Sequence, residues 1–180
     1  MNVHHNPESS LRIRQRVNDV LRGRGTTGDM LSWLRTIAAE QDIDVLAADL
    51  FDIAGVLRRE DGRWRIYINR QDSPMRQLFT LAHELGHFFL HRDGDRDFVD
   101  GEFVMHRSDD ERHKKEEREA NEFAGSLVMP ESRIRARLGE RRPSEKEILQ
   151  LADLFQVSPL AMALRLRSLG YDPAPSVSKA

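Results

Sequence analysis

The stretch HELGH at residues 83–87 decides the fold. It is an H-E-x-x-H motif, and helical geometry places residues four apart on one face. The imidazoles of His83 and His87 would therefore project together, with Glu84 beside them. Histidine and carboxylate side chains suit Zn²⁺, and a catalytic zinc site takes three protein ligands and keeps one position for water. The motif thus predicts a metal-site helix and a third ligand elsewhere in the chain.

The residues around the motif predict a buried helix. Ser73-Pro74 is typical of a helix start, an N-cap residue followed by proline at the first helical position. Most side chains from Leu78 to Leu90 are apolar, and the polar exceptions are Thr80 and the three motif residues. Polar side chains inside a buried helix cost free energy unless a partner satisfies them. We favour a metal ion as that partner over the alternative, two histidines that only hydrogen-bond in a core.

A third ligand is expected from EEREANEFAGSLVMP at residues 116–130. A helical apolar stripe runs through Ala120, Phe123, Ala124, Leu127 and Val128 and ends at proline. Counted at about 100° per residue, Glu117 lies on the side of this stripe, and Asn121 follows one turn later, where it could support a ligand histidine. We choose Glu117 as the third ligand, and Glu116 and Glu119 stay open as alternatives.

Composition narrows the class of protein. The 180 residues are 39% hydrophobic and 32% charged, enough for one compact domain or a domain with a small appendage. The formal net charge of −2 gives no support to a polyanionic partner. Cysteine is absent, which favours a reducing compartment and leaves zinc to histidine and carboxylate. No apolar run approaches the roughly 20 residues of a membrane span, so we expect a soluble cytoplasmic protein without a membrane partner.

A β-hairpin is expected directly before the motif helix. Residues 54–60 and 63–69 flank Asp61-Gly62, which is a strong hairpin signal, and residues 43–45 are a candidate third strand. The edge of this antiparallel sheet could hold an extended peptide by strand addition. The alternative is a sheet that only packs on the helix.

Two further helices are expected near the C-terminus. Residues 131–142 are charged, and we assign no element to them. Residues 144–147 form a capping box and Ser158-Pro159 opens another helix, which together give the outline of a helix-turn-helix. Recognition helices contact bases mainly through their N-terminal residues, whereas Arg165 and Arg167 come late in this one. We favour a structural subdomain, and DNA binding through these helices stays open.

Three blocks of the chain carry a family resemblance: FTLAHELGH at 79–87, EREANEFA at 117–124 leading to LVMP at 127–130, and VSP to LG across 157–170. Together, from about residue 37 to residue 171, they resemble the ImmA/IrrE family of metallopeptidases. The resemblance implies a gluzincin-like fold with zinc held by the two motif histidines and a downstream glutamate. In gluzincins that glutamate precedes an Asp or Asn by four residues, as Glu117 precedes Asn121.

The resemblance also implies a function. Members of the family are intracellular proteases that cleave a helix-turn-helix repressor and so release phage, mobile-element or stress-response genes. We predict a zinc-dependent endopeptidase with one zinc per chain, held by His83, His87 and Glu117. Glu84 would take a proton from the water that zinc activates and pass it to the leaving amine. The alternative is a toxin–antitoxin or regulatory binding protein that sequesters a partner repressor or DNA without proteolysis.

The fold expected from all this is α+β: a small antiparallel sheet packed on the active-site helix, with a C-terminal helix-turn-helix-like subdomain. Along the chain we expect an N-terminal tail and helix at 1–28, a metallopeptidase core at 29–135, a helical subdomain at 136–171 and a disordered tail at 172–180.

Two functional details stay open at this level. The charged residues 92–116 are expected to be a solvated connection that could act as a lid. The donor that stabilises the tetrahedral oxyanion could be Tyr67, His91, His106 or His113, with a supporting role favoured for His91.

Overall fold

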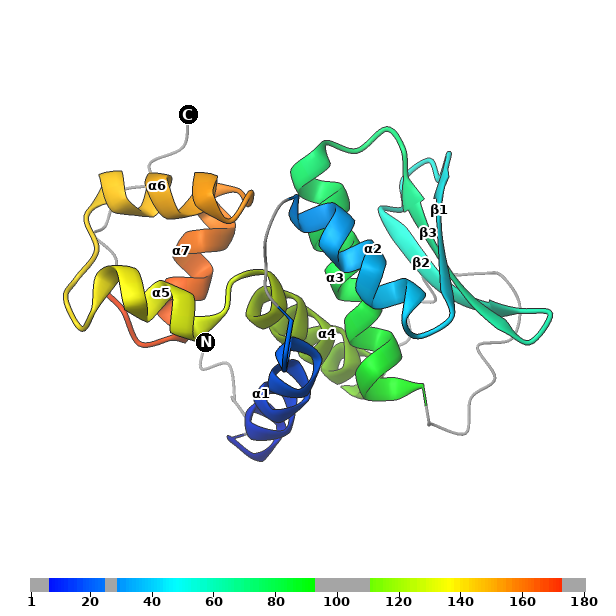
Figure 1. Ribbon diagram of the computed structural model, residues 1–180, viewed down its shortest axis with the longest axis horizontal. Helices are drawn as coiled ribbons and strands as arrows, with labels where there is room; N and C mark the ends of the chain where they lie inside the picture. Colours follow the sequence, from blue (N-terminus) through cyan, green and yellow to red (C-terminus); the bar gives the residue numbers. More distant parts are fainter. Residues whose placement is uncertain (1–6, 25–28, 93–110, 173–180) are drawn as a thin grey trace. The chain divides into compact units, whose positions relative to one another are not determined.

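The computed structural model describes residues 7–24, 29–92 and 111–172. Within them lie seven α-helices and a three-stranded sheet, which confirms the predicted α+β class. In chain order (Figure 1) the elements are α1 (Pro7–Leu21), α2 (Met30–Ala39), β1 (Ile43–Ala48), β2 (Gly55–Glu60), β3 (Arg63–Asn69), α3 (Pro74–His91), α4 (Glu111–Val128), α5 (Glu131–Leu138), α6 (Glu145–Leu154) and α7 (Pro159–Ser168).

The sheet is mixed, with strand order β1-β3-β2. The predicted hairpin is confirmed: β2 and β3 are antiparallel, and Asp61 and Gly62 at its turn both have positive φ, as a type I′ turn requires. The expectation of an all-antiparallel sheet is wrong, because β1 pairs with β3 in parallel. Strands β1 and β2 are consecutive in the chain but not adjacent in the sheet, because β3 lies between them. In the loop that joins them, the carbonyls of Phe51 and Ile53 accept hydrogen bonds of 3.1 Å from the Asn69 side chain.

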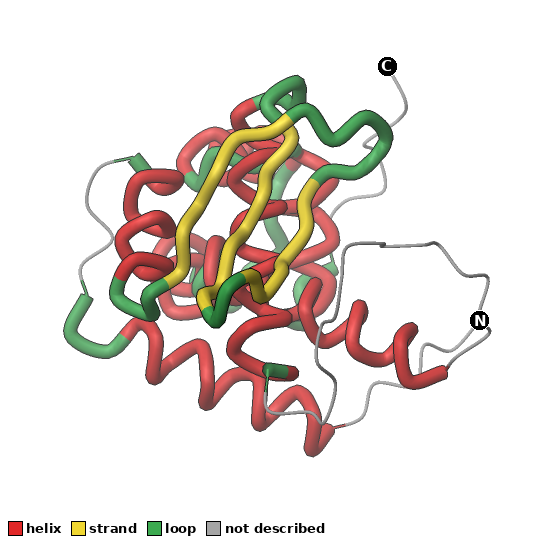
Figure 2. The backbone as a smooth tube through the Cα atoms, turned by 90° about the vertical axis from the view of Figure 1, so that its right-hand side faces the viewer, coloured by secondary structure: helices red, strands yellow, loops and turns green. Residues whose placement is uncertain are grey.

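Helices α2 and α3 pack on one face of the sheet (Figure 2). Along β3 the side chains alternate between the faces, and Ile66 and Ile68 are buried. On the same face Trp64 meets Phe88 of α3 edge-on, with ring centroids 5.6 Å apart. This contact fixes the motif helix directly against the hairpin.

Helix α3 begins as predicted. The Ser73 side chain accepts a hydrogen bond from the backbone N–H of Arg76, and Pro74 occupies the first turn. Helix α4 begins at Glu111, so residues 111–116 of the stretch expected to be a solvated connection, 92–116, belong to a helix. Residues 93–110, including His106, lie outside the described part of the chain.

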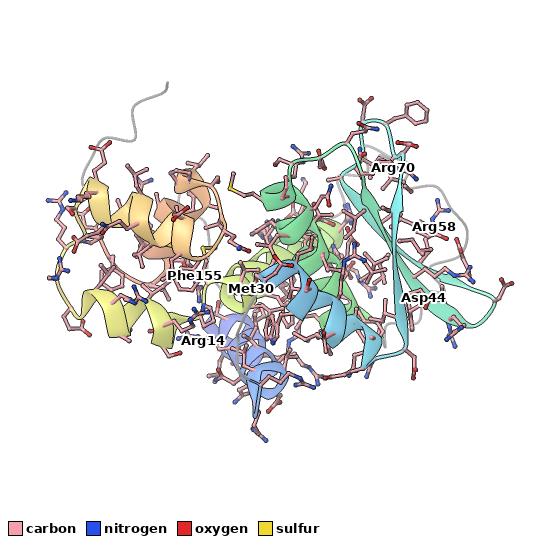
Figure 3. All side chains as sticks on the ribbon, turned by 45° about the horizontal axis from the view of Figure 1, so that its top comes forward. Arg14, Met30, Asp44, Arg58, Arg70 and Phe155 are labelled. Carbon is pink, nitrogen blue, oxygen red and sulfur yellow. The ribbon has the colours of Figure 1, made fainter. Side chains whose placement is uncertain are left out.

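The backbone contacts define two compact units, Met1–Ala124 and Gly125–Ala180. In the second, Phe155 is fully buried (Figure 3) among α5, α6 and α7. Both predicted helices are present, and the capping box of Ser144 and Glu147 forms. Helix α5 was not predicted, although Ile134 and Leu138, four residues apart, are buried. The domain limits predicted from the sequence stay a prediction.

Candidate metal centre

Three donor atoms from two helices converge at the motif. His83 and His87 lie one turn apart on α3, and their Nε2 atoms are 3.0 Å apart. Glu117 of α4 places Oε2 3.4 Å from Nε2 of His83 and Oε1 3.1 Å from Nε2 of His87. One ligand atom from each residue lies within 4.8 Å of the others. Two imidazoles and one carboxylate thus meet at a single point.

The other two candidate glutamates point elsewhere. Glu116 pairs with Arg112, whose Nε lies 2.9 Å from its Oε1. Glu119 accepts a 2.9 Å hydrogen bond from Arg12 of α1. Of the three glutamates considered from the sequence, the structure therefore brings Glu117 to the motif histidines.

The donor set fits a metal ion. Glu117 Oε1 is buried, and among the described residues no donor is aligned for a hydrogen bond to it. The two Nε2 atoms face each other at 3.0 Å, where two neutral imidazoles can share at most one proton. A cation between them would satisfy all three lone pairs, and this combination of ligand types suits zinc.

The charges at the site favour an ionised carboxylate. Burial alone would raise the pKa of Glu117, but the imidazoles of His83 and His87 outweigh it and hold that pKa well below its ordinary value. For His83, burial acts to lower the pKa, yet Glu117, Glu84 and a hydrogen bond with the Asn121 side chain raise it overall. Asn121 therefore contacts a motif histidine, as the sequence suggested for a supporting residue.

Glu84 lies between α3 and the start of β2. Its side chain is almost fully buried, and the backbone N–H of Leu57 hydrogen-bonds to it. Burial raises the pKa of the Glu84 carboxyl, which makes its carboxylate a stronger base. A Cβ added to Gly55 would come within 3.4 Å of Glu84 Oε1. The sequence analysis did not predict this contact with β2. Its one signal in the sequence is that residue 55 is a glycine.

The residues considered as oxyanion donors lie at different distances from the metal donors. The Tyr67 hydroxyl donates a 2.8 Å hydrogen bond to Glu60. Side chains alternate along β3, so Tyr67 lies on the sheet face opposite Trp64 and away from α3, and this position excludes it as the oxyanion donor. His91 lies 3.8 Å from Glu119, one turn beyond His87. His113 precedes Glu117 by one helical turn on α4. His91 and His113 each lie one helical turn from a proposed ligand, His87 and Glu117, and the oxyanion role of either stays a prediction.

Known proteins resemble the chain in sequence and in fold. The family model of the IrrE N-terminal-like domain matches residues 38–167. Metallopeptidase ImmA of Bacillus subtilis (strain 168) is 26% identical over 158 residues, which cover 88% of this chain and 86% of that protein. A solved Mycobacterium tuberculosis transcriptional regulator is similar with a TM-score of 0.60 at 16% identity, over 90% of this chain and 47% of that one. The chain thus spans about half of that regulator, and this likeness supports the α+β fold.

None of the helices in the described part of the chain combines the length and the hydrophobicity that a bilayer span requires.

Proposed function

The chain belongs to the IrrE N-terminal-like peptidase family, and from this premise we propose that it is a zinc-dependent endopeptidase. Membership and the relation to Metallopeptidase ImmA support a metallopeptidase that acts on a protein substrate. The observation that carries the proposal is the convergence of His83, His87 and Glu117 within 4.8 Å. These three residues would hold the zinc, and Glu84 would be the catalytic acid–base residue.

The chemistry follows from the placement of Glu84. When bound, zinc acts as a Lewis acid on a carbonyl oxygen and makes water nucleophilic near neutral pH. Glu84 accepts a proton from the attacking water and delivers it to the leaving amine. The Leu57 N–H holds the carboxylate in place, and burial raises its pKa toward the range in which a group can both take and return a proton.

Strand β2 offers a path for the substrate. Among the described residues it is an edge strand, because the order is β1-β3-β2, and its first residues lie beside Glu84. An extended segment of a protein could add to the outer edge of β2 through backbone hydrogen bonds. Such a segment would bring a peptide bond past the Glu84 carboxylate.

The substrate we propose is a helix-turn-helix repressor, whose cleavage would release phage, mobile-element or stress-response genes. Support for this step comes from the family resemblance of the three sequence blocks. The binding-protein alternative gains no specific support, because a protein that only sequesters a partner has no need for a buried Glu84 beside three convergent donors.

The test compares the wild type with Glu84→Gln in cells of the native host that lack the chromosomal copy. New protein N-termini are labelled and identified by mass spectrometry, and metal content is measured on both purified proteins. We expect a new N-terminus in a helix-turn-helix protein with the wild type alone, at equal metal content. Identical sets of N-termini, with zinc bound to both proteins, would establish the binding protein instead.

A further inference from the structure

A buried carboxylate lies close to the metal site without belonging to it. Glu119 follows Glu117 by two residues on α4, and only 7% of its side chain is exposed. A buried charge is costly unless it is paired and hydrogen-bonded. Two partners come from α1: the Ser9 hydroxyl donates a short hydrogen bond to Oε1, and the Arg12 guanidinium donates one of 2.9 Å to Oε2.

Glu119 also lies near one side chain of α3 and one of its own helix, α4. Nε2 of His91, in the last turn of α3, lies 3.8 Å from its Oε2, beyond hydrogen-bond distance, and Nζ of Lys115, one turn earlier on α4, lies 3.9 Å from its Oε1. One buried carboxylate of α4 is therefore hydrogen-bonded to α1 and lies beside the end of α3.

A second contact repeats this arrangement one turn further along α4. The Ser10 hydroxyl donates a 3.1 Å hydrogen bond to Oε2 of Glu122. Ile13 and Val17 bury the apolar side of α1. Helix α1 ends at Leu21, before residue 38 where the family match begins. It is thus an element of this chain outside the matched peptidase region.

We propose that Ser9 and Arg12 are positioning residues for the metal site. Residues two apart on a helix point in nearly opposite directions, about 200° from one another. When α1 holds Glu119 on one side of α4, it fixes the rotation of α4 about its own axis. That rotation directs Glu117, on the opposite side of the helix, to His83 and His87. Without the α1 partners, the Glu119 carboxylate turns toward water and rotates α4, which draws Glu117 away from the imidazoles. This inference rests on the proposed metal site.

The experiment measures metal binding rather than proteolysis. Zinc affinity is determined by chelator competition, and the visible absorption spectrum of the Co²⁺-loaded protein reports the ligand set. The variants are Arg12→Ala, Ser9→Ala and Glu117→Ala, with Arg12→Lys as the conservative rescue. Arg16→Ala is the matched control, since Arg16 is an exposed arginine of the same helix.

We expect Arg12→Ala and Ser9→Ala to bind zinc about tenfold more weakly, the range seen when support of a metal ligand is removed. Their Co²⁺ spectra should shift toward that of Glu117→Ala, which a loss of stability alone would not cause. Arg12→Lys should recover part of the affinity, and Arg16→Ala should match the wild type. Circular dichroism of the metal-free proteins checks folding, and Ser9→Ala carries the test if Arg12→Ala does not fold.

Wild-type affinity and spectra in both α1 variants, together with loss of binding in Glu117→Ala, would overturn this inference and leave the metal site intact. Unchanged binding in Glu117→Ala, or no zinc binding by the wild type, would overturn the inference together with the proposed ligand set.

Discussion

Gly86 of α3 and Ala120 of α4 stand so close that a Cβ on Gly86 would lie 3.0 Å from both the Cα and the carbonyl oxygen of Ala120. Glycine inside a helix costs about 1 kcal/mol relative to alanine. The close approach explains its presence here, because any larger residue would push the two helices apart. The contact lies between His83 and His87 on one helix and three residues beyond Glu117 on the other, so it sets the distance across which the donors meet.

We predict that Gly86→Ala weakens metal binding and destabilises the protein. The added methyl meets backbone atoms, which cannot rotate away, and overpacking of this kind costs about 1–3 kcal/mol. The free energy of unfolding from urea titrations and the zinc affinity should both fall. Gly125→Ala is the control, because Gly125 is a glycine of α4, the other helix of this contact, and its added Cβ would meet only Cε of Met129, at 3.9 Å. This control should be neutral or stabilising by up to about 1 kcal/mol; equal effects of the two substitutions would contradict the helix-spacing argument.

A second prediction separates catalysis from metal binding. Gly55→Ala places a methyl group against Cγ2 of Thr80 and 3.4 Å from Oε1 of Glu84. We expect zinc to stay bound while peptide cleavage falls at least about tenfold, since a small displacement of a catalytic group is costly. The double variant Gly55→Ala with Thr80→Ser removes the clashing methyl of Thr80 and should recover part of the activity. A loss of zinc in the single variant would show that β2 supports the ligands rather than Glu84.

The metal site was predictable because its geometry is local. His83, Glu84 and His87 lie within two turns of one helix, and the direction of Glu117 follows from the apolar stripe of α4. Helical spacing favoured Glu117 and left Glu116 and Glu119 open, and the contacts in the structure bring Glu117 to the histidines. The contact of Glu84 with Gly55 and Leu57 was not predictable, because it depends on how β2 packs on α3 and involves backbone atoms that leave no mark in the residue pattern.

The same distinction holds for the fold. The β2–β3 hairpin is encoded by two turn residues, Asp61 and Gly62, and its register follows. The parallel pairing of β1 with β3 depends on a loop held by Asn69, a tertiary contact that alternation of side chains does not reveal. Helix α5 was missed because charge dominates its eight residues, and two buried positions, Ile134 and Leu138, are too few to show a period.

The helical unit gives a prediction on pH. Hydrogen bonds from Arg141 and from Ser144 lower the pKa of Glu147 from an ordinary 4.5 to about 2. Because the pKa of Glu147 is lower in the folded state than in the unfolded state, the folded state is stabilised at pH values above the ordinary pKa of 4.5. This stabilisation is lost as the pH falls toward 2. Glu147→Gln should therefore unfold at lower urea concentration than the wild type at pH 6, and the difference should shrink between pH 4.5 and 2. A difference that stays constant over this range would contradict the contacts of Glu147 with Arg141 and Ser144 as the source.

Metal content per chain tests the central claim most directly. Elemental analysis is made on the wild type, Glu117→Ala and Glu116→Ala, after removal of any purification tag and of the His4-His5 segment, which could bind metal by itself. We predict about one zinc per chain in the wild type and in Glu116→Ala, and markedly less in Glu117→Ala, because Glu117 alone of the two meets the motif histidines. A wild type that binds no metal when zinc is supplied, or a Glu117→Ala variant with an unchanged zinc content, would contradict the three-ligand site.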